Sequence, residues 1–245
     1  FLNAYRGIAA GLMYEDKHEE ALAQLRKALD SASTDSERRQ TIFAMAVCFT
    51  DQGKIKEALE QVSKLSELAA QRADKAAMAS AASTRGDLLL KTGRTKEARE
   101  AFTTALDLIR QSTIPDATKK NYEIGSHANL ALLACAGKDF ATAAKEAEIA
   151  RSGFEAAGNP NQTRGAQEVL GIIALQQKKY DDAIAHLNQA NLQSPFVMFQ
   201  LGKAHAGKKD ADSARTWYRK AAVAYTLPDL DYALIRKQAQ KASSQ

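Results

Sequence analysis

Three columns of residues recur six times along the chain at helical spacing. In each copy an alanine is followed by a mostly apolar residue four positions later, and by a mostly small residue three positions after that. Offsets of four and three place all three residues on one face of a helix, so each copy predicts an amphipathic helix. The alanines that anchor the six copies are Ala21, Ala58, Ala98, Ala143, Ala183 and Ala214.

A further column of small residues stands twelve positions before these alanines, at Ala9, Ala46, Gly86, Ala131, Gly171 and Gly202. The residue just before it is large and apolar except at Arg85. Each unit therefore predicts two helices, and the small residue of the first lets the second approach closely. One pair cannot bury its own apolar face, so the pairs have to stack on one another.

These columns resemble the tetratricopeptide repeat, in which antiparallel helix pairs stack. The fifth unit fits best, with Leu170-Gly171, Tyr180, Ala183, Leu187, Ala190 and Pro195. The resemblance implies an all-α fold, a right-handed α-solenoid of about six antiparallel helix pairs with a C-terminal capping helix. The spacing between anchoring alanines varies between 31 and 45 residues, against about 34 in the standard unit, so the curvature should be irregular.

The register divides residues 1–245 into the pairs of a single superhelical domain. We expect pairs at roughly 2–33, 36–72, 75–112, 116–157, 161–193 and 195–225, and a capping helix at 229–243. Thr34 and Glu37 fit a capping box that opens the second unit. Asp229 should cap the last helix, whose Leu230, Ala233 and Leu234 would cover the end of the stack. Because the chain starts at Phe1 and no cap precedes the first pair, we expect the protein to continue upstream.

The register also predicts the side chains that line the concave face. Asn129 could hydrogen-bond a peptide backbone or be a solvated or structural residue. The apolar members could form a binding stripe or could be filled by packing. Arg85 indicates a local register shift, a side chain that extends to solvent, or a pair with Asp87. The candidate groove residues are Arg6, Phe43, Val47, Asp87, Asn129, Leu132, Glu168, Ile172, Phe199 and Lys203.

Motifs for catalysis, metal or cofactor binding are absent from the sequence, and we predict no cofactor. The four histidines are far apart, and the two cysteines, Cys48 and Cys135, lie in apolar stretches typical of buried residues. Residues 202–209 match the spacing of a phosphate-binding loop, but the final Ser or Thr and the preceding strand are missing. A lysine and asparagine clamp for a chaperone tail, which the resemblance would allow, has Ala, Ser or Gly where its cations and amides should stand.

The sequence therefore favours a non-catalytic scaffold that binds a peptide or partner protein in a concave groove. One alternative is a regulatory or sensor segment of a larger protein. Another is a binder of nucleic acid or an acidic partner, because residues 201–245 hold nine basic and four acidic side chains and account for the whole net charge of +5. The sequence has no segment apolar enough to span a membrane, and it leaves compartment, partner and oligomeric state open.

Overall fold

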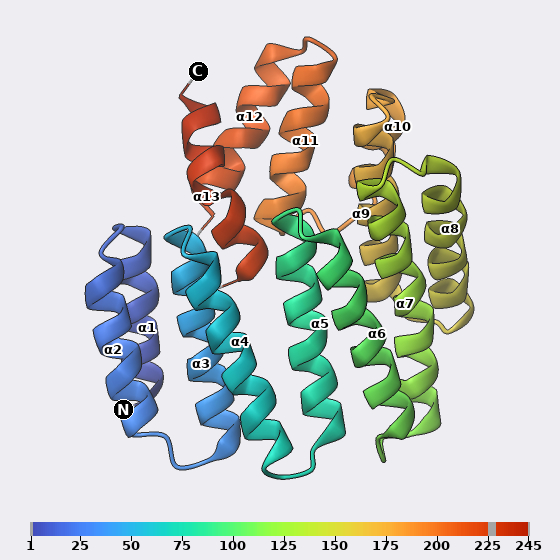
Figure 1. Ribbon diagram of the computed structural model, residues 1–245. Coiled ribbons are helices and arrows are strands. Elements are labelled where there is room, and N and C mark those ends of the chain that lie inside the picture. Colours follow the sequence, from blue (N-terminus) through green and yellow to red (C-terminus); the bar gives the residue numbers. More distant parts are fainter. Residues whose placement is uncertain (1, 225–228, 245) are drawn as a thin grey trace.

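The computed structural model describes residues 2–224 and 229–244, and in these residues it contains helices and no strand (Figure 1). None of these helices is long and apolar enough to cross a membrane. The helices are α1 (Leu2–Tyr14), α2 (His18–Asp30), α3 (Asp35–Asp51), α4 (Ile55–Ala70), α5 (Lys75–Lys91), α6 (Thr95–Gln111), α7 (Asp116–Ala136), α8 (Phe140–Ala156), α9 (Pro160–Gln176), α10 (Tyr180–Leu187), α11 (Pro195–Gly207), α12 (Ala211–Ala222) and α13 (Leu230–Ser243).

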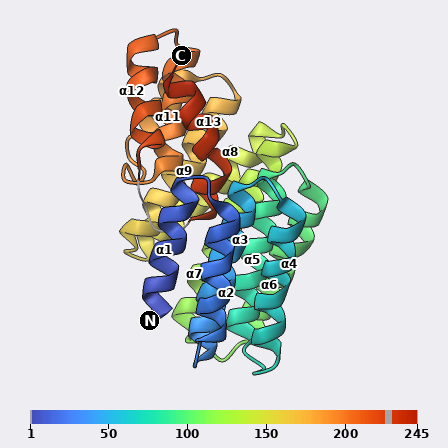
Figure 2. The same ribbon diagram turned by 90° about the vertical axis from the view of Figure 1, so that its left-hand side faces the viewer.

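The first twelve helices form six pairs, from α1/α2 to α11/α12, and each pair packs on the next. The pairs follow a curved path, so that α11 and α12 lie above the N-terminal pairs in both views (Figures 1 and 2). The expected all-α solenoid of helix pairs is confirmed. We call the surface formed by the first helices of the pairs (α1, α3, α5, α7, α9 and α11) the concave face.

Within the pairs, the small-residue column allows the close approach that the sequence predicts. A Cβ atom added at Gly86 would lie 2.5 Å from the Phe102 ring, and one at Gly171 would lie 2.6 Å from Leu187 Cγ. Real Cβ atoms do not approach other atoms this closely, so only glycine fits without a shift. In both pairs the partner stands sixteen residues after the glycine, which is the predicted register.

Arg85 therefore does not mark a register shift. Its side chain is half-buried and lines a cleft between α4, α5 and α6, beside Glu97 and Glu100. The positive charge of Arg85 contributes to the lowered pKa of Glu97, after the larger effects of the hydrogen bond from Arg94 and the charge of Arg94. The proposed pair with Asp87 is wrong in the structure, because Asp87 faces the other side of α5, toward α13.

The turn inside each pair contains one residue with positive φ, namely Asp16, Gly53, Gly93, Lys138, Lys178 and Lys209. This left-handed residue reverses the chain in a few residues and brings the second helix back along the first. The predicted capping box is also confirmed. Glu37 N donates to Thr34 Oγ1 at 3.2 Å, and Thr34 N donates to Glu37 Oε2 at 2.9 Å.

The segment that resembles a phosphate-binding loop lies mostly within α11 and does not form a loop of that kind. A Cβ atom at Gly202 would lie 2.5 Å from the Tyr218 ring, and one at Gly207 would lie 2.2 Å from the Tyr180 ring. Both glycines therefore serve helix packing.

The C-terminal helix differs most from expectation. Asp229 caps it as predicted, with its carboxylate accepting from Asp231 N at 2.8 Å. However, α13 packs on α3 as well as on α11 and α12, so it lies against the concave face and does more than cover the last pair (Figures 1 and 2). The reason is its second apolar strip, because Tyr232, Ile235 and Ala239 are buried in addition to the predicted Leu230 and Ala233.

Candidate functional site

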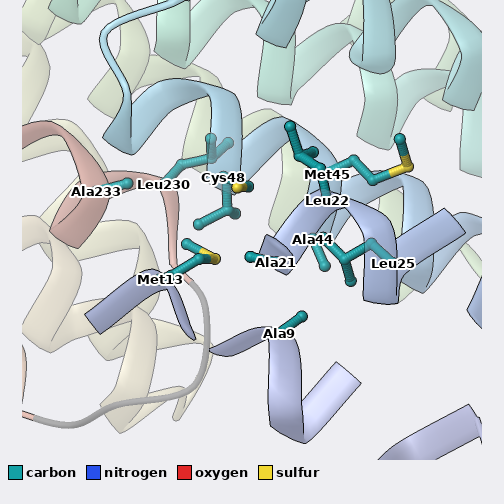
Figure 3. Packing of buried hydrophobic residues seen from close by; sticks show 11 residues of the cluster. Ala9, Met13, Ala21, Leu22, Leu25, Ala44, Met45, Cys48, Leu230 and Ala233 are labelled. Atoms are coloured by element: carbon teal, nitrogen blue, oxygen red, sulfur yellow. The ribbon is translucent and has the colours of Figure 1, made fainter. Parts of the chain in front are cut away.

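One side of α13 completes the hydrophobic core of the N-terminal pairs. Leu230 and Ala233 join a buried cluster that contains Met13 from α1 and Val47 and Cys48 from α3 (Figure 3). Each of these five side chains is less than a tenth exposed. The concave face at α1 and α3 is therefore occupied by a helix from the other end of the chain.

The opposite side of α13 packs on the C-terminal pairs. Tyr232, Ile235 and Ala239 form a cluster with Phe196 and Phe199 from α11. Leu234 lies between these surfaces and also contacts the core that α5 and α6 form. The helix thus connects first helices from both halves of the solenoid.

A buried ion-pair network fixes the position of α13. Arg236 Nε donates to Asp51 Oδ1 at 2.7 Å, and Arg236 Nη2 donates to Asp51 Oδ2 at 2.6 Å. The same guanidinium donates to Asp16 and to the carbonyl oxygen of Tyr14, and His18 Nε2 lies 2.6 Å from Asp51 Oδ2. The Arg236 and Asp51 side chains are only 3% and 1% exposed, so each charge depends on the other for compensation.

Asp16, His18 and Asp51 also form the single group in residues 2–224 and 229–244 whose donor atoms come close enough together to hold a metal ion. Arg236 already supplies a positive charge and hydrogen-bond donors to both carboxylates. These three residues therefore form the binding site of the Arg236 guanidinium, and we assign no metal ion to them.

Beside α13 the concave face remains open as a groove of about 710 Å³ between α5, α7, α9, α11 and α13. A volume of this size is typical of ligand sites, which are mostly apolar with a few placed polar groups. The apolar lining includes Leu132, Phe140, Val169, Ile172, Phe196 and Ile235, and the polar lining includes Lys91, Lys138, Glu168, Gln200, Lys203 and Gln238.

The charged groups of the groove differ in how they are compensated. Lys91 forms an ion pair with Asp231 of α13, and its ammonium lies 4.9 Å from the centre of the Phe196 ring. Lys203 has no hydrogen bond or ion pair with any residue in the described part of the chain, and partial burial lowers its pKa. An uncompensated ammonium in a largely apolar groove attracts an anionic group.

Glu168 lies in the same groove and has an unusual pKa. The pKa of this carboxyl is raised to about 7, mainly by burial; the nearby carboxylates of Asp231 and Asp229 also raise it, and the ammonium of Lys91 lowers it. Asp87, which faces α13 from α5, has its pKa raised to about 6 by burial. Near neutral pH both groups change readily between the charged and the neutral form.

The structure brings together four of the ten predicted groove residues, Leu132, Glu168, Ile172 and Lys203. Phe43 and Asp87 line a smaller cleft with Asp229, Leu230 and Asp231. The other four do not line the groove.

Of those four, Val47 and Phe199 are covered by α13. The prediction that they line an open groove is therefore wrong for these two residues. Arg6 donates to Gln40 Oε1 at 2.5 Å, away from the groove. Asn129 is half-buried and lies outside the groove lining, so the structure offers no support for its role in peptide recognition.

Sequence reasoning missed Lys91, Lys138, Gln200 and all residues from α13. Lys91 stands four residues after Asp87, so helical spacing could have placed it on the same face. The contribution of α13 carries no local signal, because it depends on where the curved stack ends.

Two sequence profiles described as tetratricopeptide repeat match the chain, one at residues 38–111 and one at residues 169–226. Together they cover more than half of the chain. No curated protein sequence matches.

Several solved structures are similar in fold. The apo form of RapI has a TM-score of 0.60 at 11% identity, over 99% of this chain and 84% of that one. A Rap protein complexed with competence and sporulation factor has a TM-score of 0.57 at 14% identity, over 98% of this chain and 64% of that one. BtubC from P. vanneervenii has a TM-score of 0.49 at 21% identity, over 76% of this chain and 83% of that one. The similarity to the two Rap structures indicates a shared fold. On the two profile matches, and on the helix pairs that they describe, the chain belongs to the tetratricopeptide-repeat family.

Proposed function

We propose that this chain is a non-catalytic protein–protein interaction scaffold that binds a peptide segment of a partner in the groove beside α13. The observation that carries the proposal is the groove itself, about 710 Å³ of open volume on the concave face with an apolar floor and separate charged groups. An extended or helical segment of a partner has the shape to fill such a groove.

The lining indicates the chemistry of the segment. Leu132, Ile172 and Phe196 offer contacts to an apolar side chain. Lys203 offers an ammonium for an acidic side chain close to it, since no carboxylate of the described chain compensates it. A segment that combines an apolar residue with an acidic one is therefore the best complement.

The fold supports this function by analogy. One of the similar structures is a Rap protein complexed with competence and sporulation factor, so a solenoid of this kind can hold such a factor. Fold alone does not fix function, and the argument here rests on the groove.

The structure weakens the nucleic-acid alternative. The basic C-terminal segment does not present all of its charges to solvent, because Arg236 is buried against Asp51 and Lys208 pairs with Asp181. Lys220 lies over the Trp217 ring at 4.3 Å. The regulatory alternative would use the same groove and stays a prediction.

The test is a selection of binding peptides from a random displayed library, followed by affinity measurements. Ile172→Glu places a charge in the groove, and Ile149→Glu makes the same change on α8, where Ile149 is 39% exposed. Peptides selected on the wild-type chain should lose at least about tenfold in affinity, or ~1.4 kcal/mol, on Ile172→Glu and keep it on Ile149→Glu. Lys203→Glu should lower the affinity of the acidic peptides among them.

Circular dichroism confirms that each variant is folded before its affinity is compared. Peptides that bind Ile172→Glu and the wild-type chain equally well would place the binding site elsewhere and contradict the proposal.

A further inference from the structure

Resting on the function proposed above, we propose that the groove beside α13 selects a peptide segment with both a basic and an acidic side chain, the basic one bound at Glu168 and the acidic one at Lys203 and Gln200. We call these three residues the selectivity residues. They carry different chemistry, namely a carboxyl, an ammonium and a neutral amide, and all three line the same groove.

Lys203 and Gln200 form the part of the groove that accepts an acidic side chain. They stand three residues apart on α11, so they lie on one face of that helix. Gln200 is only 7% exposed, and its side-chain amide has no hydrogen bond with any residue in the described part of the chain. Lys203 has no partner there either. Because buried polar groups are nearly always hydrogen-bonded, this amide and the neighbouring ammonium together offer donors to a carboxylate.

Glu168 forms the part of the groove that accepts a basic side chain. Its carboxyl has no hydrogen bond or ion pair with any described residue. The negative charges of Asp229 and Asp231 act on Glu168 from the start of α13, and the ammonium of Lys91 opposes them. Lys91 is already paired with Asp231 and also lies near Asp87. A cationic side chain from a partner therefore meets an excess of carboxylates.

The two parts of the groove together identify the occupant by charge complementarity. A segment with acidic residues alone would pair with Lys203 but would bring more negative charge to the carboxylates around Glu168. A segment with basic residues alone would leave Lys203 and Gln200 without an acceptor. A segment that carries one residue of each sign compensates both parts, so the groove discriminates against the other two kinds.

Binding of the basic side chain should also change the protonation of Glu168. The pKa of Glu168 is raised to about 7, mainly by burial, and a bound cation would lower it by stabilising the carboxylate. A cation that binds only the ionised form should therefore bind about tenfold more tightly at pH 8 than at pH 6. The other titratable groups that face Glu168 or line the same groove and the adjoining cleft are Asp87 and Lys91 of α5, Lys138 of α7, Lys203 of α11, and Asp229 and Asp231 at the start of α13.

The experiment uses groove peptides, which we define as peptides of the displayed library that bind the wild-type chain and lose affinity on Ile172→Glu. Each basic and each acidic residue of these peptides is changed to alanine in turn. Isothermal titration calorimetry then measures the affinity of every synthetic peptide for the wild-type chain, Glu168→Gln, Lys203→Ala and Gln200→Leu. Glu60→Gln is the matched control, because it makes the same change at an exposed carboxyl of α4.

Replacing the basic residue of a groove peptide should lower its affinity at least about tenfold on the wild-type and Glu60→Gln chains, and less than about threefold on Glu168→Gln. Replacing the acidic residue should show the same dependence on Lys203 and a smaller one on Gln200. On the wild-type chain the affinity should rise about tenfold from pH 6 to pH 8, and Glu168→Gln should remove most of this rise. If Glu168→Gln does not fold, the peptide replacements and the pH series on the wild-type chain decide.

Three results would overturn this inference and leave the proposed function intact. One is a set of groove peptides that lack either a basic or an acidic residue. Another is a basic residue whose replacement costs as much affinity on Glu168→Gln as on the wild-type chain. The last is an affinity that is the same at pH 6 and pH 8. A library that yields no groove peptide would instead contradict the proposed function and this inference together, so the two failures are distinguishable.

Discussion

Replacing Gly171 or Gly165 by alanine makes the same chemical change twice in α9, with opposite expected effects. At Gly171 the new Cβ would lie 2.6 Å from Leu187 Cγ and 3.3 Å from the backbone nitrogen of Leu187. At Gly165 nothing lies within 4 Å of the new Cβ. The pair therefore separates helix propensity from packing.

The magnitudes follow from these two environments. Alanine in place of glycine inside a helix contributes about 0.5–1 kcal/mol of stability. Overpacking a close contact costs about 1–3 kcal/mol, because part of the obstacle at Gly171 is backbone that cannot rotate away. Gly165→Ala should therefore stabilise the chain by about 0.5–1 kcal/mol, and Gly171→Ala should destabilise it by about 0.5–2 kcal/mol.

Urea unfolding followed by circular dichroism at 222 nm, a standard helix signal, measures the difference between the two variants. A double variant tests the cause directly. Leu187→Ala leaves a cavity beside Gly171, so it should cost about 2–5 kcal/mol alone and clearly less in the Gly171→Ala background. Equal stabilities of the two glycine variants, or strict additivity with Leu187→Ala, would refute the close packing at this point.

The remaining predictions concern buried charges and thiols. Arg236→Ala leaves Asp51 buried without its cation and should cost about 3–5 kcal/mol in urea unfolding, whereas Lys241→Ala should stay within about 0.5 kcal/mol; a small loss in Arg236→Ala would contradict the network. The pKa of Glu168 is raised from 4.5 to about 7 in the folded chain, so its contribution to stability is complete below pH 4.5 and is lost as the pH rises through 7. Glu168→Gln should therefore gain stability relative to the wild-type chain between pH 5 and 8, and a constant difference in unfolding free energy across that range would argue against it. Burial raises the pKa of the Cys48 thiol to about 12, so at pH 8 only about one thiol in 10⁴ is ionised, and a disulfide reagent monitored by absorbance should modify Cys48 only as the chain unfolds.

The candidate site shows which part of the prediction depended on local pattern. Leu132, Ile172 and Lys203 were found because first helices present the same positions to the concave face in every unit. Val47 and Phe199 satisfied the same rule and are covered, since a rule that describes one unit contains nothing about a helix that arrives from another.

What the sequence by itself determined is the helix pair and its register. Small residues such as Gly86 and Gly171 face large partners sixteen positions later, and this relation lies within one unit, where spacing along the chain fixes spacing in space. Only the tertiary structure decided where α13 lies. The turn of the solenoid accumulates over six pairs of unequal length, and their sum brings Arg236 to Asp51 across 185 residues. A small change in the angle between any two neighbouring pairs would move Arg236 away from Asp51, so no local sequence pattern can encode this contact.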